Sequence, residues 1–471
     1  MYNTCMKRHF LLFFVLFLIS IVFTIYANSF CLSGDDIWIM IQSANDLFAA
    51  DHGSLLPVKI LTFLNFQLPI FLNINPQIML AKYNIFLYGI FYTCIIYLLT
   101  NAAFIFNKDK LYRPLYLIIN AVLIFSFSML ISANQYFYWM KESCTYLRFT
   151  FSIITLLLLV SFAIQNILLK KINIISKKNI ILIFFYSLLA ANTSEYNCFV
   201  CFIFGCLFIA DLLFSKGIKN NKKLLKFSLT SLFGIITGAI LIILNPAFRE
   251  ITYESGRVGL YFPGKSLSVF LPVYASEMLM INLIYMLIAV VFILILKKMY
   301  IRPLYSLFTK ISVLLFISVN LFYPFLYLFT KSLGELSHGD LKLLVVCSLV
   351  FNLWLLFGLI LKKIKNIKVK AIINIIILIC WSLIIGIKYN VIINEVVKIR
   401  RTNFKERAYL SYLEHNLSEQ YINKNTREIR LKIDKSIPLD YRETYVYNYI
   451  PIINKKIIMD TYKVEWITEE E

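Results

Sequence analysis

Charged residues are scarce in this sequence and make up only 15% of its 471 residues. Soluble domains average about 25% charged and roughly 45–50% apolar residues, whereas the hydrophobic share here is 60%. The shortage of charge excludes an ordinary soluble domain and predicts a chain embedded in lipid. The alternating segments of about 10 residues that are typical of a membrane β-barrel are also lacking.

Several motifs of soluble enzymes are missing as well. No run of His, Asp or Cys has metal-ligand spacing, and there is no P-loop and no nucleophile elbow. Cys198 and Cys201 form a C-x-x-C pair on an apolar stretch without partner ligands, which favours packing over a metal or redox role. The isolated His52 and His338 are expected to be structural. The sequence indicates no definite cofactor, although carboxylates could hold a divalent cation such as Mg²⁺ or Mn²⁺.

Long apolar runs are abundant and recur along most of the chain. Runs of about 20 residues can cross a hydrocarbon core of about 30 Å. Lys and Arg gather in every second connection between the runs, as expected of cytosolic loops. The net charge of +21 therefore indicates membrane topology and not nucleic-acid binding. The sequence predicts an all-α polytopic membrane protein with about eleven spans and a cytosolic N-terminus.

The expected spans include residues 11–27, 79–106, 115–133 and 371–393, and the expected external loops include 28–77, 134–148, 247–278 and 334–340. The first run has no small-residue cleavage site and is expected to be retained. An odd number of spans places residues 394–471 outside, as an extracytoplasmic α/β module after a transmembrane domain of residues 1–393. In this module 395–418 is expected to be helical, and 428–434 alternates as a half-buried strand would. The cluster at Lys398, Arg400 and Arg401 would instead suit the cytosol.

The first external loop opens with adjacent carboxylates, Asp35 and Asp36, followed by Trp38. On an extended chain they face opposite sides, so at least one can point into a cavity. Such a carboxylate can deprotonate an acceptor hydroxyl or hold a divalent cation. The alternative is that one of them caps a helix over residues 37–50, and the two interpretations are compatible, since one Asp can cap while the other acts.

Two further polar clusters lie at expected external boundaries. Asn192 to Asn197 contains the lone acid Glu195 between two apolar runs, and it is either a functional site or a tight polar turn. The loop after the third span carries Trp139, Glu142, Tyr146 and Arg148. Aromatic residues there either anchor the chain at the membrane interface or, for Trp139, stack on a sugar ring.

The loop after the seventh span contains Asn245, Arg249 and Arg257. External arginines run against the usual charge asymmetry, and their guanidinium groups suit bidentate phosphate binding. The alternative is pairing with Glu250 and Glu254 in the same loop.

The order of these motifs resembles a bacterial family of multi-pass membrane proteins, the DUF6056/GtrIII-like group, which is related to GT-C glycosyltransferases. The resemblance covers nearly the whole chain and comprises Asp35-Asp36, Trp139 to Tyr146, Asn192 to Glu195, Asn245 to Arg249, and residues 448–466 of the tail. The chain departs from the family pattern at two motifs. The family has Gly and Asn at the positions of Glu142 and Thr145, and it has Gly-Asn at the position of Ala247-Phe248.

The resemblance implies a transferase of the cytoplasmic (inner) membrane that moves a sugar from a polyprenyl-phosphate donor to a cell-envelope glycan. The reaction would take place on the extracytoplasmic face, next to the lipid bilayer. The implied catalytic residues are Asp35, Asp36 and Glu195. The implied substrate-binding residues are Trp38, Trp139, Glu142, Tyr146, Asn192, Asn245, Arg249 and Arg257.

Three other functions remain open. A lipid-linked polysaccharide polymerase would also work outside and would suit the two external arginines. A transporter or flippase usually keeps ionisable residues near the bilayer midplane, and the expected span centres are nearly free of charge, although a lipid flippase needs fewer such residues. A non-catalytic envelope scaffold would tolerate substitution of every acidic residue.

Overall fold

The computed structural model describes residues 2–27, 60–72, 74, 77–105, 112–134, 143–166, 176–193, 195–214, 222–244, 283, 336–364, 366–398, 400–401, 408, 415, 428–433 and 463–468. The regular elements before residue 402 in these ranges are helices, which confirms the all-α prediction for them. The strand predicted in the tail is confirmed as β1 (Glu428–Ile433).

The long helices match the first seven and the last two predicted spans. They are α1 (Tyr2–Ala27), α5 (Gln77–Phe104), α6 (Arg113–Asn134), α7 (Ser143–Ile164), α8 (Lys177–Ala191), α9 (Glu195–Phe214), α10 (Lys222–Ile243), α15 (Leu336–Lys363) and α16 (Ile367–Ile387). A π-helical turn, Phe63–Gln67, leads into the short α4 (Leu68–Phe71). The eighth and ninth predicted spans lie outside the described residues, apart from Leu283 in a helix.

Two predicted loops are too long. Helix α7 begins at Ser143, inside the loop expected at 134–148, and α15 begins at Leu336, inside the loop expected at 334–340. The polar residues of these two stretches predict loops. The first turn of a helix, however, has backbone N–H groups without partners inside the helix. Polar residues are therefore compatible with a solvated helix end. His338 and Asp340 therefore belong to the first turns of α15.

Local signals explain where several helices begin. The side chain of Ser176 accepts a hydrogen bond from the backbone N–H of Asn179 and caps α8, and the side chain of Asn366 caps α16 through the N–H of Lys368. Helix α6 starts with Arg113-Pro114, and proline is favoured in the first turn because its missing N–H is not needed there.

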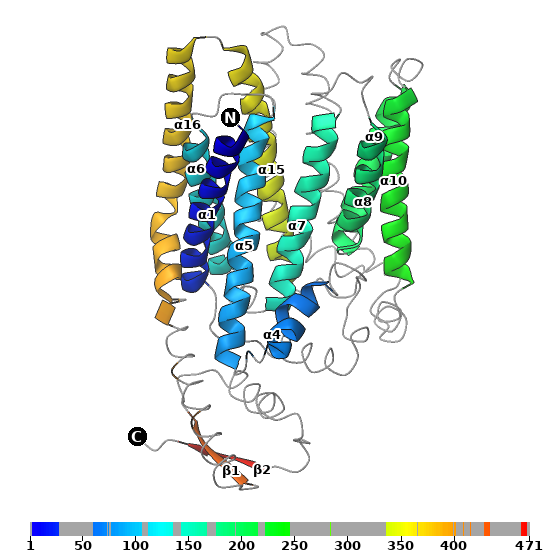
Figure 1. The fold of residues 1–471 in the computed structure, drawn as a ribbon. Helices are drawn as coiled ribbons and strands as arrows, with labels where there is room; N and C mark the ends of the chain where they lie inside the picture. Colours follow the sequence, from blue (N-terminus) through cyan, green and yellow to red (C-terminus); the bar gives the residue numbers. More distant parts are fainter. Residues whose placement is uncertain are drawn as a thin grey trace, which may run out of the picture.

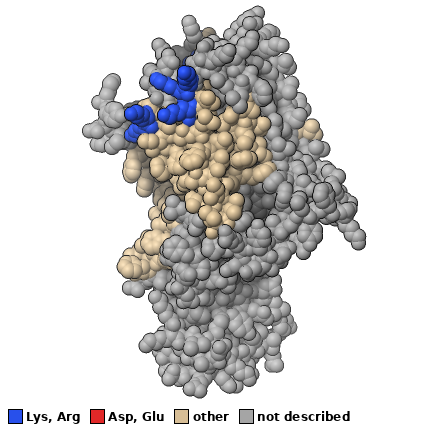
Figure 2. Space-filling model, turned by 90° about the vertical axis from the view of Figure 1, so that its right-hand side faces the viewer, with Lys and Arg blue, Asp and Glu red and all other residues tan. Residues whose placement is uncertain are grey.

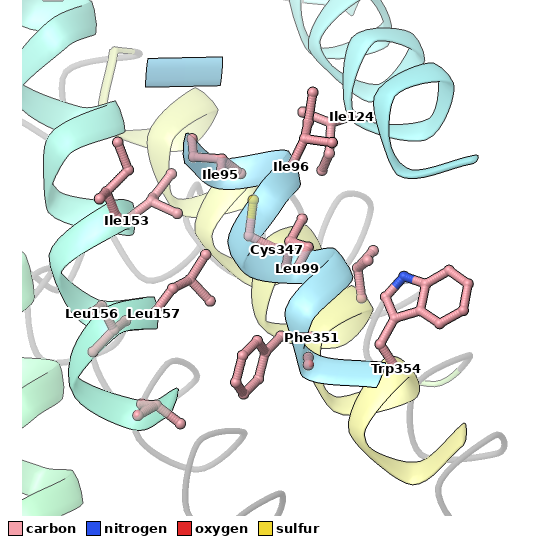
Figure 3. Packing of buried hydrophobic residues seen from close by; sticks show 14 of the residues in the cluster. Ile95, Ile96, Leu99, Ile124, Ile153, Leu156, Leu157, Cys347, Phe351 and Trp354 are labelled. Carbon is pink, nitrogen blue, oxygen red and sulfur yellow. The ribbon is translucent and has the colours of Figure 1, made fainter. Parts of the chain in front are cut away.

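Helix α5 lies at the centre of the described bundle (Figure 1). It packs against α1, α6, α7 and α15. Figure 3 shows the contact between three of these helices, with Leu99 of α5, Leu157 of α7 and Phe351 of α15 in one buried cluster. These side chains are almost fully removed from the surface, so α5 is held by apolar packing on several sides.

Helices α8 and α10 form a second close contact. Small residues at four-residue spacing face one another: Gly234 and Gly238 on α10, Ser187 and Ala191 on α8. The hydroxyl groups of Ser187 and Ser231 are 2.7 Å apart. Small residues allow two helix backbones to approach closely, which is how membrane helices often associate.

The outward faces of the bundle carry large apolar side chains. Exposed residues of this kind recur on α1 (Phe10, Phe14, Leu18, Val22), on α10 (Leu229, Phe233, Ile236, Ile240) and on α16 (Ile372, Ile376, Ile379, Leu383). By length and composition, two stretches of the described chain could cross a membrane, Lys82–Phe104 and Lys222–Ile243. Shorter apolar stretches of 10–17 residues occur in α1, α6, α7, α9 and α15.

The tail contains a two-stranded parallel sheet, β1 paired with β2 (Lys463–Thr468). The register places Glu428 opposite Lys463 and Leu431 opposite Trp466. In Figure 1 the strands lie beyond the end of the bundle that is opposite to the N-terminus. The predicted helix at 395–418 is described over residues 395–398 and 400–401 and at 408 and 415, which are helical, and the rest of it lies outside the described residues.

Candidate functional site

The structure describes three of the predicted site residues. Asn192 is described with its side chain, and Tyr146 and Glu195 are placed by their backbone in the first turns of α7 and α9. The remaining predicted residues lie outside the described residues: Asp35, Asp36, Trp38, Trp139, Glu142, Asn245, Arg249 and Arg257.

The turn between α8 and α9 is a buried polar cluster. Asn192 ends α8, and its backbone N–H donates to the carbonyl of Leu188 at 2.9 Å. Its side-chain Nδ2 donates to the carbonyl of Gly238 on α10 at 3.1 Å. The Thr193 hydroxyl donates to the carbonyl of Ala190 at 2.9 Å. Both side chains are buried, so the Asn192 and Thr193 side chains are bonded within the protein.

Asn197 extends this cluster from α9 to α7. Its Nδ2 donates to the backbone carbonyl of Ser152 at 2.7 Å and to the Thr193 hydroxyl at 3.1 Å. The cluster thus holds α7, α8, α9 and α10 together at one level of the bundle. Asn192 and Asn197 have a clear structural role there, and the predicted role of Asn192 toward a substrate stays a prediction.

Glu195 begins α9 directly after this turn. The first residues of a helix carry a partial positive charge from the aligned peptide dipoles, which stabilises a carboxylate. The structural cluster beside it fixes the position of this helix end. The first turn of α7, which contains Tyr146, lies at the same end of the bundle as the start of α9 (Figure 1).

Helix directions bring the other predicted segments toward this end too. The α5–α6 contacts Tyr92–Ser128 and Arg113–Asn101 show that these helices are antiparallel, and Asn179–Asn166 joins the start of α8 to the end of α7. The last residues of α1, α6 and α10 and the first residues of α5, α7 and α9 therefore lie at one end (Figure 1). Each predicted site residue either lies in these helix ends or belongs to a segment that they flank.

The other end of the bundle is basic. We call it the basic end and define it by Arg113, Lys177, Lys178, Lys222, Lys223, Lys226, Lys362, Lys368 and Lys370. Figure 2 shows one side of it, with Lys and Arg gathered at the top of a face of other residues. The end with the polar turn, which we call the opposite end, carries Lys82, and the chain after α16 adds Lys388, Lys398, Arg400 and Arg401.

The sequence did not single out a buried polar group between α5, α6 and α15. The Asn120 side chain accepts a hydrogen bond from Nε1 of Trp354 and donates to the Thr100 hydroxyl at 2.9 Å. The Tyr116 hydroxyl donates to the Oδ1 of Asn374 and so joins α6 to α16. The available signal was the polar residue itself within an apolar run, because such residues in membrane helices usually bond across an interface.

No group of three or more potential metal ligands occurs among the residues whose side chains are described. Cys201 is buried in the core cluster, and Cys198 packs against it, as the packing interpretation predicts.

The chain matches no family model, no curated protein and no solved structure. What this protein does is therefore inferred from its own sequence, contacts and surfaces.

Proposed function

We propose that this is a multi-pass protein of a bacterial cytoplasmic membrane, with its basic end in the cytosol. The exposed apolar faces of α1, α10 and α16 support this, because large contiguous apolar surfaces are unfavourable in water. The Gly-rich contact between α8 and α10 supports it as well. The concentration of Lys and Arg at one end is the asymmetry expected of cytosolic loops.

The helix lengths fit a bilayer. At 1.5 Å per residue, α5 with 28 residues is about 42 Å long and α10 with 22 residues is about 33 Å long. A hydrocarbon core is about 30 Å thick. Helix α8 has 15 residues, or about 22 Å, and would reach only part of the way alone. Its buried polar turn with α9 is then covered by α7 and α10, as backbone at that depth must be.

We propose that the protein is a glycosyltransferase that moves a sugar from a polyprenyl-phosphate donor to a cell-envelope glycan. The observation that supports this best is that the described helix ends next to the predicted site segments lie opposite the basic end. With the basic end in the cytosol, that site faces the side without nucleotide sugars. A lipid-linked donor can enter it sideways from the bilayer.

The proposed reaction forms one bond and breaks one. The carboxylate of Asp35 or Asp36 takes the proton from an acceptor hydroxyl, whose oxygen forms a bond to the anomeric carbon of the donor sugar. The bond from that carbon to the phosphate oxygen breaks, and polyprenyl phosphate leaves. Arg249 or Arg257 stabilises the phosphate. Trp139 stacks on the sugar, and Glu195 orients a substrate.

The distribution of buried charge favours transfer over ion-coupled transport. In the described residues, the charged side chains that are buried are Arg113 and Glu395. Arg113 starts α6, and Glu395 lies beyond the end of α16 with Lys398 at 3.9 Å. Ion-coupled transporters usually place such groups near the midplane, and these two lie near opposite ends of the bundle.

The test uses membranes that contain the full-length chain and a panel of polyprenyl-phosphate hexoses with labelled sugar. We expect Asp35→Asn or Asp36→Asn to lower the transfer rate by about 100-fold or more, since general base catalysis contributes roughly 10²–10⁴. Asp46→Asn, in the same connection, serves as the matched control and should retain activity. Full activity of both Asp35→Asn and Asp36→Asn would refute the assignment. A single added sugar indicates transfer, whereas a ladder of repeats would show a polymerase.

A further inference from the structure

Arg113 is a buried cation at the basic end. It begins α6, only 7% of its surface is exposed, and its neighbour Pro114 continues the first turn. The lysines of this end whose exposure is described are, by contrast, largely on the surface. Arg113 is therefore placed by the fold in a partly enclosed position at the level where the bundle meets the cytosolic boundary of the proposed membrane.

Neutral groups hold the Arg113 guanidinium in place. One Nη donates to the Oδ1 of Asn101 near the end of α5. The guanidinium carbon lies 5.1 Å from the ring centroid of Tyr97 and 5.7 Å from that of Phe104. Both distances are within the range of cation–π attraction. The group is thus oriented by an amide and two aromatic rings.

The charge of Arg113 has no anionic partner within the described part of the chain. The described ion pair is Lys398 with Glu395, and the buried Nε of Arg113 has no acceptor among the described residues. Removing a guanidinium from water without an opposite charge is costly. An amide oxygen and two rings offset only part of this cost, so the site favours an anion.

We propose that Arg113 binds the phosphate of an anionic lipid headgroup in the cytosolic leaflet. A guanidinium presents a planar fork of donors that matches phosphate oxygens. The Nε has no acceptor but is enclosed by the chain in this structure, so a phosphate reaches it only when the enclosing contacts open. The lysines of the basic end attract an anionic membrane surface. The rings of Tyr97 and Phe104 provide apolar walls next to the charge. This proposal rests on the membrane placement and not on sugar transfer.

The experiment uses the purified full-length chain in detergent micelles, titrated with phosphatidylglycerol while the melting temperature is recorded. We expect a rise in melting temperature for the wild type. Arg113→Gln should weaken the apparent affinity by about tenfold or more, as expected for a charge-assisted hydrogen bond. The matched control Lys226→Gln removes an exposed charge of the same end and should stay within about twofold of the wild type.

Two control titrations test whether free phosphate or a zwitterionic lipid raises the melting temperature as phosphatidylglycerol does. Inorganic phosphate at the same concentration should give no shift, and an equal shift would overturn the lipid assignment. Zwitterionic phosphatidylcholine should also give none. Without lipid, Arg113→Gln should be at least as stable as the wild type, because an uncompensated buried charge is removed.

The alternative is that Arg113 pairs with a carboxylate of the same chain. Asp109 lies four residues earlier in the sequence, outside the described residues, and is the candidate for this test. If Arg113→Gln and Asp109→Asn each lower the melting temperature without lipid, and the double variant is no worse than either, the charge is paired within the chain. That result, or an equal phosphatidylglycerol shift in wild type and Arg113→Gln, would overturn the proposal. If Arg113→Gln does not fold, Arg113→Lys replaces it, because lysine keeps the positive charge but lacks the planar donors of the guanidinium. An unchanged affinity of Arg113→Lys for phosphatidylglycerol would also contradict the proposal.

Discussion

Several buried polar side chains of the bundle are matched to partners on neighbouring helices. Asn120 joins Thr100 and Trp354, and Asn197 joins Thr193 and the carbonyl of Ser152. In a low-dielectric interior, a donor or acceptor without a partner is costly. The first group therefore fixes how α5, α6 and α15 pack together, and the second does the same for α7, α8 and α9. Apolar contacts alone specify such packing less sharply.

The Asn120 group gives a prediction at this scale. Asn120→Leu, which keeps the volume similar, should lower the free energy of unfolding by about 1–3 kcal/mol because it leaves the buried Nε1 of Trp354 without an acceptor. Trp354→Phe in the same chain removes that donor, so the double variant should be more stable than the sum of the single changes predicts. Thermal unfolding in detergent measures this coupling, and strict additivity would contradict the hydrogen bond.

Glycine positions give a second prediction. A Cβ at Gly358 of α15 would overlap the backbone carbonyl of Ala103 of α5, whereas a Cβ at Gly386 of α16 meets nothing within 4 Å. Gly358→Ala should destabilise the bundle by about 1–3 kcal/mol, since the obstructing atom is backbone. Gly386→Ala should be neutral or stabilise by up to about 1 kcal/mol through helix propensity. Equal melting temperatures for the two variants would contradict the described α5–α15 contact.

For single residues, the sequence identified the unusual polar and charged positions but not what their side chains contact. Asn192 was noticed because it is polar between apolar runs, and the structure describes it as a buried helix cap bonded to Gly238. Arg113 was noticed only as part of a basic connection, because burial depends on which rings lie beside it. Partners such as Tyr97 and Asn101, 16 and 12 positions away in the sequence, follow from the pairing of helices and are not apparent in the sequence alone.

At the scale of helices, apolar runs were a reliable guide to existence and a poorer guide to boundaries. The start of α7 at Ser143 and of α15 at Leu336 fell in expected loops, because hydropathy marks the lipid-like part of a helix and not its polar first turns. Pairing was not predictable in the same way. The parallel contact of α8 with α10 depends on Gly234 and Gly238 meeting small residues of α8.

Helix α10 offers a direct test of the lipid-facing surface. Phe233, near the middle of α10, is 63% exposed on its outer face. A lysine there would cost about 2.5–3.5 kcal/mol in a bilayer, so Phe233→Lys should sharply reduce the membrane-inserted fraction, while Phe233→Leu should not. Extraction with alkaline carbonate, followed by quantification of the pellet, measures this fraction. Unchanged insertion of Phe233→Lys would indicate that this face does not contact lipid.

For the whole molecule, the alternation of helix directions connects sequence and function. Contacts such as Arg113–Asn101 and Asn166–Asn179 fix which helix ends meet. The positive-inside pattern of the sequence and the basic end of the structure agree for the described helices up to α16. The chemistry of the proposed site could not be placed in the same detail, because most of its predicted residues lie outside the described ranges.

The tail is the part of the molecule where charge and topology point in different directions. Lys398, Arg400 and Arg401 follow α16, and a basic cluster would suit the cytosol. In Figure 1, however, β1 and β2 lie beyond the end of the bundle that is opposite to the basic end. A site-specific protease site inserted after residue 418 should therefore be cleaved from outside intact spheroplasts, and cleavage only after lysis would place the tail in the cytosol.

Reporter fusions locate the two ends of the bundle relative to the membrane. Alkaline phosphatase, which is active only outside the cytosol, is fused after Asp51 or after Lys171 in the full chain expressed in bacteria. We expect high activity for the fusion after Asp51 and low activity for the fusion after Lys171, with the reverse for a fluorescent protein that matures only in the cytosol. The opposite pattern would contradict the orientation, and with it the proposed donor and site.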